Sequence, residues 1–225
     1  MTTSAMTSPL GSRLPHRFQP LRALGSVVFV CAVSGLAGAL TPIGERHLPE
    51  SVSSMANSSG SWTLIAFVAI YLSGLRSWGA AVMGAMSFLV MNAAFDVVFG
   101  RYGVEYPHRD LLFWCFIAVA VGPIVGLSAA WLRGGSPALR AVGAAAPSAV
   151  LIGEGVYMLV QLPGTSTLYA HASVSVGILL FLGISLFRLR RFSAVVLSAA
   201  LCGLGATMFF AVYGMLPVVL HKIVP

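Results

Sequence analysis

The chain has 225 residues, of which 58% are hydrophobic and only 8% are charged, and its mean hydropathy is +0.91. Because a soluble domain carries roughly 25% charged residues, this composition indicates an integral membrane protein whose first partner is the lipid bilayer. The formal net charge is +7. Its basic residues stand in short turns and not on one continuous face, which argues against a nucleic-acid partner.

Stretches of about 20 apolar residues predict seven transmembrane helices. They lie near residues 24–43, 61–75, 78–99, 111–132, 141–160, 169–187 and 193–219. The second is short for a hydrocarbon core of about 30 Å, so we expect Arg76 to snorkel at its end. The predicted fold is an all-α, polytopic transmembrane bundle in one domain at 24–220, between a basic tail at 1–23 and a short outer tail at 221–225.

Basic residues fall on alternate loops, which predicts the orientation of the bundle. With the N-terminus in the cytoplasm and the C-terminus outside, the inner segments hold nine arginines and no acid: Arg13, Arg17, Arg22, Arg76, Arg133, Arg140, Arg188, Arg190 and Arg191. The expected location is therefore the inner (plasma) membrane.

The first apolar segment allows an alternative interpretation. A basic leader and an apolar run end in Ala37-Gly38-Ala39, which has the small-residue form of a signal-peptidase site. Cleavage there would leave six spans. The same small residues also suit helix packing.

Glu154 is the acid that most needs an explanation, because an ionised side chain at a helix centre costs roughly 2.5–3.5 kcal/mol. It stands between Gly153 and Gly155 in LIGEGVYMLV, and an acid there should face the bundle interior or a wet cavity. The alternative is a protonated or hydrogen-bonded glutamate that only ties helices together. Other candidates for a substrate or proton site are Asp96, Asn92, Gln161 and Tyr157.

Small residues and prolines mark positions where helices can approach or bend. The segment VGPIVG holds Gly122, Pro123 and Gly126 in GxxxG spacing, which is typical of helix packing and, with the proline, of a kink. Pro147 lies two turns before Glu154 and leaves the carbonyl of residue 143 without its helical partner. Gly153 and Gly155 leave room for a helix or a ligand to approach. Asn57 to Ser59 reads as a polar turn and helix N-cap before Trp62.

Several catalytic and cofactor sites can be excluded by spacing and depth. Ser128 and His171 stand near opposite ends of their helices, more than about 20 Å apart, so they cannot form a serine–base pair. The only lysine, Lys222, is at the wrong depth for a retinal Schiff base. The cysteines and histidines lack metal-ligand spacing. We therefore expect no metal and no cofactor.

Three segments carry a resemblance to a family of small multi-spanning bacterial membrane proteins of unknown function. The first holds Ala56, Asn57, Ser58 and Trp62, and the second Gly122, Pro123, Gly126, Trp131 and Arg133; the third holds Gly153, Glu154, Gly155 and Tyr157. The resemblance covers most of residues 49–160 and implies no activity. At the level of fold alone, the chain is also similar to the substrate-binding membrane subunits of energy-coupling transporters.

Three classes of function remain open. The sequence favours a small-molecule transporter or substrate-binding membrane subunit. In this interpretation Glu154, Asp96, Asn92 and Gln161 line an outward-opening polar cavity, and Tyr157 shapes it. The second is a non-catalytic accessory or assembly subunit, bound to a membrane partner or to another copy of the chain. An intramembrane enzyme is the least favoured, because no nucleophile or second acid stands at the depth of Glu154.

Overall fold

The structure is a computed structural model that describes residues 19–103, 107–164 and 167–223, with side chains described between residues 21 and 215. The described residues form helices and no strand. In chain order the helices are α1 (Gln19–His47), α2 (Glu50–Ser53), α3 (Ser59–Ser73), α4 (Ser77–Gly100), α5 (His108–Gly134), α6 (Pro137–Gln161), α7 (Thr167–Arg188) and α8 (Phe192–Ile223).

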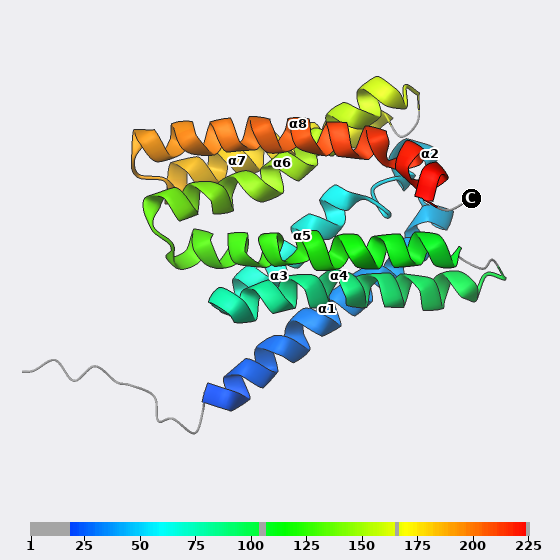
Figure 1. Ribbon diagram of the computed structural model, residues 1–225, viewed down its shortest axis with the longest axis horizontal. Helices are drawn as coiled ribbons and strands as arrows, with labels where there is room; N and C mark the ends of the chain where they lie inside the picture. The colour runs from blue at the N-terminus through cyan, green and yellow to red at the C-terminus, as the bar shows by residue number, and fades with distance from the viewer. Residues whose placement is uncertain (1–18, 104–106, 165–166, 224–225) are drawn as a thin grey trace, which may run out of the picture.

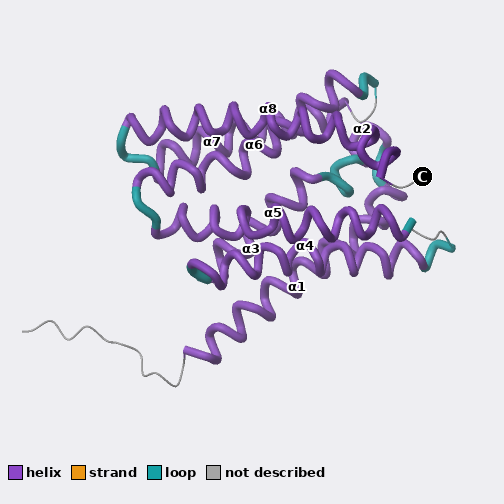
Figure 2. The backbone as a smooth tube through the Cα atoms, viewed as in Figure 1, coloured by secondary structure: helices purple, strands orange, loops and turns teal. Residues whose placement is uncertain are grey.

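The long helices form two groups, one of α1, α3, α4 and α5 and the other of α6, α7 and α8. The groups meet where α3 and α5 contact α6. Helices α1, α3, α4 and α5 pack together, α7 and α8 each pack along α6, and both α5 and α3 reach α6 (Figure 1). Short turns join most of the long helices at the two ends of the bundle (Figure 2). Helix α3 therefore lies at the centre, surrounded by α1, α4, α5 and α6.

Six helices are long and apolar enough to cross a membrane, which confirms the predicted multi-spanning bundle. The remaining predicted span, which is the second in chain order at 61–75, corresponds to α3, which has only 15 residues. At 1.5 Å per residue α3 is about 22 Å long, short of a hydrocarbon core of about 30 Å. Its ends therefore need partners within the protein.

One end of the bundle collects arginines, and we call it the arginine end. Helices α3, α5 and α7 finish there, whereas α1, α4, α6 and α8 begin there. Its described arginines are Arg22, Arg76, Arg133, Arg140, Arg188, Arg190 and Arg191. No described acid lies at this end. The described residues thus show the concentration of arginines at one end of the bundle from which the cytoplasmic orientation was predicted.

Glycines allow α4 and α5 to approach closely. A Cβ atom added to Gly122 would lie 2.6 Å from the Cα of Ala85, and one added to Gly126 would lie 1.9 Å from the carbonyl oxygen of Ala80. On the facing helix, a Cβ at Gly84 would lie 2.0 Å from the carbonyl oxygen of Gly122. The GxxxG segment is therefore used inside this chain, against α4.

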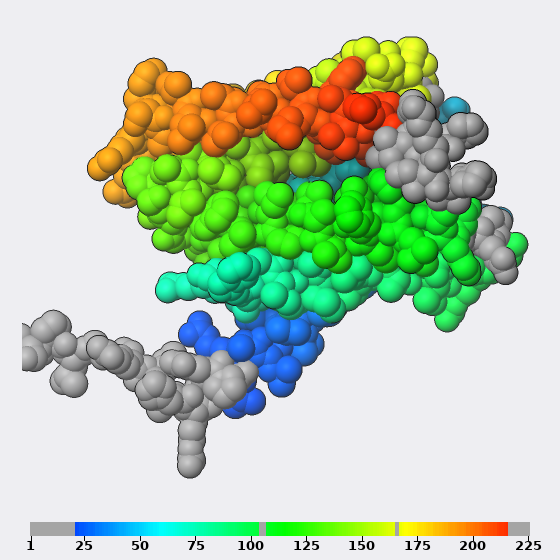
Figure 3. Space-filling view, in the orientation of Figure 1, coloured from blue at the N-terminus to red at the C-terminus, as the bar shows by residue number. Residues whose placement is uncertain are grey.

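Helix α1 is tied into the bundle along its length. The hydroxyls of Ser34 and Ser87 are 2.7 Å apart in the α1–α4 contact, and Ser26 donates a hydrogen bond of 2.8 Å to the carbonyl of Ser73. A Cβ at Gly38 would lie 2.1 Å from the carbonyl oxygen of Met91. The blue N-terminal part of α1 stands out from the rest of the molecule (Figure 3). Cleavage after residue 39 would remove all three contacts.

We predict that Gly126→Ala lowers the free energy of unfolding by roughly 1–3 kcal/mol, because the added methyl group overpacks the α4–α5 contact. Gly183→Ala is the matched control, since no atom lies within 4 Å of a Cβ there. The control should be neutral or stabilising by up to about 1 kcal/mol. Thermal unfolding in detergent checks this expectation, and equal melting of both variants would contradict it.

Candidate functional site

The carboxylate of Glu154 lies at the N-terminus of α3. Its Oε1 accepts a hydrogen bond of 2.9 Å from the backbone N–H of Ser59, and its Oε2 accepts one of 2.9 Å from that of Gly60. These are two of the N–H groups that an α-helix leaves without an internal partner. Only 4% of Glu154 is exposed. Because α6 ends seven residues later, at Gln161, this contact lies about 10 Å inside the end of that helix.

Two hydroxyl groups complete the environment of the carboxylate. Ser58 and Tyr169 each donate a hydrogen bond of 2.9 Å to Oε2 of Glu154, and they also contact each other. Ser58, which lies within the predicted N-cap segment Asn57 to Ser59, is the N-cap residue of α3, and its hydroxyl accepts a hydrogen bond of 2.9 Å from the N–H of Ser61. The carboxyl group thus has four donors, three at Oε2 and one at Oε1. We call Ser58, Ser59, Gly60, Glu154 and Tyr169 the Glu154 cluster.

Glycines around Glu154 admit neighbouring helices. A Cβ at Gly153 would lie 2.9 Å from the carbonyl oxygen of Ala206 on α8, and one at Gly155 would lie 2.7 Å from that of Ala170 on α7. A Cβ at Gly60 would lie 2.6 Å from Oε2 of Glu154 itself. The GEG sequence therefore lets α6 contact three helices within three residues.

Arg133 stands at the opposite end of α3. Its guanidinium donates to the carbonyls of Ile70, at 3.2 Å, and of Tyr71 and Leu75. It also lies over the ring of Tyr71, 5.8 Å from the centroid. An acid at the N-terminus and a base at the C-terminus both match the helix dipole. Side chains of α6 and α5 thus satisfy both ends of the short helix.

The other predicted site residues do not join this cluster. Asn92, which is buried, and Asp96, which is partly exposed, lie on α4, and α4 packs against α1, α3 and α5. Tyr157 packs its ring against Phe210 on α8, with centroids 5.8 Å apart. Gln161 is exposed at the end of α6. The structure therefore brings none of these four residues to Glu154.

Both predicted kink prolines lie within helices: Pro147 is fully buried in α6, and Pro123 lies inside α5.

No group of three or more His, Cys, Asp or Glu side chains in the described part of the chain is arranged to hold a metal ion.

Sequence reasoning missed the partners of Glu154 and the role of Arg133. Tyr169 is 15 residues from Glu154 along the chain and on another helix, so no local spacing connects them. The sequence placed Arg133 among the basic residues that predict orientation and among the residues of the family resemblance, and neither indicates a contact with α3. The available signal was the shortness of the segment 61–75, because a helix that ends inside an apolar bundle needs side chains to satisfy its ends.

Comparisons with known proteins give a family and no activity. A family of unknown function, DUF6518, matches residues 17–218. This match also covers the first helix and the last two, where the sequence resemblance rested only on apolar character. No curated protein and no solved structure matches the chain.

We predict that Tyr169→Phe lowers stability by about 1–3 kcal/mol, because it removes a hydroxyl that donates to a buried carboxylate. Tyr157→Phe is the control, since its ring contacts aromatic side chains of α8 and its hydroxyl has no hydrogen bond to any side chain or backbone group that the structure describes. Melting temperatures in one detergent compare the two. If both variants melt alike, the hydroxyl of Tyr169 contributes nothing to the cluster.

Arg133→Lys should also destabilise the protein, by about 1–2 kcal/mol, although it keeps the charge. A guanidinium reaches several carbonyls at once through separate nitrogens, whereas an ammonium is a single point donor. Arg190→Lys, at an exposed position at the same end, should leave the melting temperature unchanged. A wild-type melting temperature for Arg133→Lys would show that charge alone suffices.

Proposed function

The chain belongs to DUF6518, a family of unknown function, and from its geometry we propose that it is a non-catalytic accessory or assembly subunit of a membrane complex. The observation that carries the proposal is the environment of Glu154. All four donors to this carboxylate come from the chain itself. The acid that best fitted a substrate or proton site is thus engaged in holding helices together.

Other buried polar groups support the same interpretation. Ser173 on α7 donates 2.8 Å to the carbonyl of Leu151 on α6, and Ser198 on α8 donates 2.9 Å to that of Ala141. Together with the Ser34–Ser87 contact, these bonds join α6 to α7 and α8, and α1 to α4. Interhelical bonds of this kind stabilise a membrane bundle. The described interior also holds two buried hydroxyls without a hydrogen-bond partner, those of Ser128 and Ser185.

Helix α8 offers the surface that a partner would use. It contacts α6 along one side, and on its other sides it exposes large apolar side chains, among them Val196, Leu204, Met208, Val212 and Met215. Such a face suits the bilayer and equally suits a transmembrane helix of a partner or of a second copy. The accessory role needs a face of this kind, whereas a transporter needs a polar cavity.

A transporter is the second candidate, and one observation favours it. Transporters place half-helix N-termini near the bilayer midplane, where they bind anionic groups of the substrate. The N-terminus of α3 is a helix end inside the bundle, and Glu154 occupies it. If Glu154 moved away, two N–H groups would become available to a substrate anion.

Glu154→Gln separates the two candidates. The amide offers N–H groups where the cluster needs an acceptor, so the accessory role predicts lower abundance and a loss of about 1–3 kcal/mol in stability. Asp96→Asn, a partly exposed acid on α4, is the control and should leave both unchanged. A stable, abundant Glu154→Gln protein would contradict the proposal and favour the transporter.

A second experiment tests the partner directly. The protein is purified from its native membrane in mild detergent, and the accessory role predicts a stoichiometric membrane protein or a homo-oligomer. In the double variant Leu204→Trp with Met208→Trp, two larger side chains stand on the exposed face of α8. They should clash with a partner packed on this face and dissociate the complex. Leu112→Trp, on the exposed face of α5, should not. A monomer both in detergent and in nanodiscs would overturn the proposal.

A further inference from the structure

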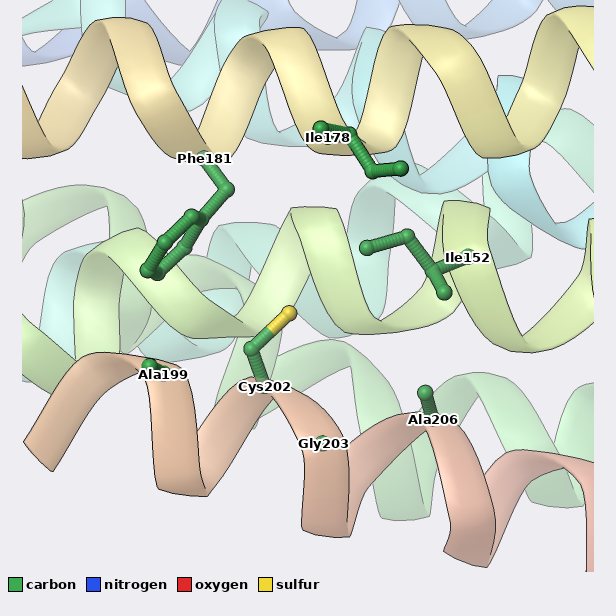
Figure 4. Close-up of a pocket in the computed structure, with 7 residues that line it drawn as sticks. All are labelled: Ile152, Ile178, Phe181, Ala199, Cys202, Gly203 and Ala206. Carbon is green, nitrogen blue, oxygen red and sulfur yellow. The ribbon is translucent and has the colours of Figure 1, made fainter. Parts of the chain in front are cut away.

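Helices α7 and α8 leave an apolar groove between them. Each packs along α6, and α6 forms the floor of the groove (Figure 4). The cavity measures about 190 Å³, and its lining residues are Ile152, Ile178, Phe181, Ala199, Cys202, Gly203 and Ala206. No atom lies within 4 Å of a Cβ added to Gly203, so the α8 side of the groove has free space.

The volume of the groove limits the size of the molecule that can bind in it. A transmembrane helix has a diameter of about 10–12 Å and cannot enter it, whereas a dry apolar cavity of about 150 Å³ holds a benzene-sized molecule. Phe181 and Ile178 project from α7 toward the α8 side, where Cys202 and Ala206 face them (Figure 4). Several methylene groups of a hydrocarbon chain match this volume and this chemistry.

The turn that joins the same two helices is basic. Arg190 and Arg191 follow the end of α7 and are both exposed. Next to them, Arg188 lies over the ring of Tyr71, 5.7 Å from the centroid, and donates to its hydroxyl. Basic sites between transmembrane helices on the cytoplasmic side are typical places for anionic lipid headgroups.

The groove and the turn lie at a suitable distance from each other. Ala199 is eight residues after Arg191 and Ala206 is fifteen residues after it, so the lining begins about 12 Å and ends about 22 Å from the turn along α8. One leaflet of a hydrocarbon core is about 15 Å thick. The part of the groove nearest the turn therefore lies within this leaflet, where the end of an acyl chain whose headgroup contacts the turn can enter it, and the rest of the groove extends past the bilayer centre.

We propose that the groove between α7 and α8 and the turn at Arg190 and Arg191 together bind one anionic phospholipid from the leaflet at the arginine end. The groove holds part of an acyl chain, and the two arginines hold the phosphate. This site lies beyond the accessory role proposed above and does not depend on it, because a lipid would bind whether or not a partner is present.

Native mass spectrometry of the purified chain tests the proposal, with phosphatidylglycerol and phosphatidylcholine of identical acyl chains as probes. Wild-type protein should prefer phosphatidylglycerol by roughly twenty- to thirtyfold, because each arginine near the surface contributes about 1 kcal/mol. The double variant Arg190→Gln with Arg191→Gln should bind both lipids equally. Arg76→Gln, another exposed arginine at this end, should keep the preference.

A groove variant tests the acyl chain separately. Gly203→Leu fills the free space and should abolish retention of both lipids, whereas Gly183→Leu, which also has open space but does not line the groove, should not. Wild-type melting temperatures show that both variants fold. Phosphatidylglycerol bound by Gly203→Leu as by wild type would overturn the proposal, since a headgroup or free phosphate alone would then account for binding. So would a retained preference in the double arginine variant.

Discussion

The structure depends on one requirement, which is that both ends of α3 be satisfied inside an apolar bundle. A helix that stops short of the bilayer surfaces leaves backbone N–H and C=O groups without water, and each such group costs free energy comparable to a lost hydrogen bond. Glu154 accepts from the first N–H groups, and Arg133 donates to the last carbonyls. Two ionisable residues from different helices thereby make a 15-residue helix possible at the centre of the molecule.

The residues around these two contacts follow from the same requirement. Gly60 must lack a side chain because the carboxylate of Glu154 takes that space. Gly153 and Gly155 allow α8 and α7 to close around the turn that carries the acid, which excludes water and lipid from it. The motif residues Ser58, Glu154 and Arg133, which are far apart in the chain, are thus explained by one short helix. These residues make their hydrogen bonds to α3 and not to an open cavity.

Much of the fold could be predicted from the sequence. Apolar length predicted six spans that the structure contains, and the Ser58 N-cap followed from a local pattern. What could not be predicted depends on contacts between distant segments: that Tyr169 meets Glu154, that Arg133 reaches back to α3, and that the short α3 lies at the centre of the bundle. Asp96, Asn92, Gln161 and Tyr157 were grouped by polarity alone, and polarity does not determine which helix faces which.

The order of the chain gives the capping of α3 a consequence for biogenesis. Both side chains that complete this helix, on α5 and α6, are synthesised after it, and so is Tyr169 on α7. Since chains emerge from the ribosome N-terminus first, α3 is made before Arg133, Glu154 and Tyr169, and of the contacts at its N-terminus only the Ser58 cap can form at once. Helix α3 must remain at the membrane surface, or be shielded by the insertion machinery, until the fifth and sixth helices arrive. Insertion of this protein is therefore not a sequence of independent hairpins, and a chain truncated before α6 should be recognised as incomplete by membrane quality control.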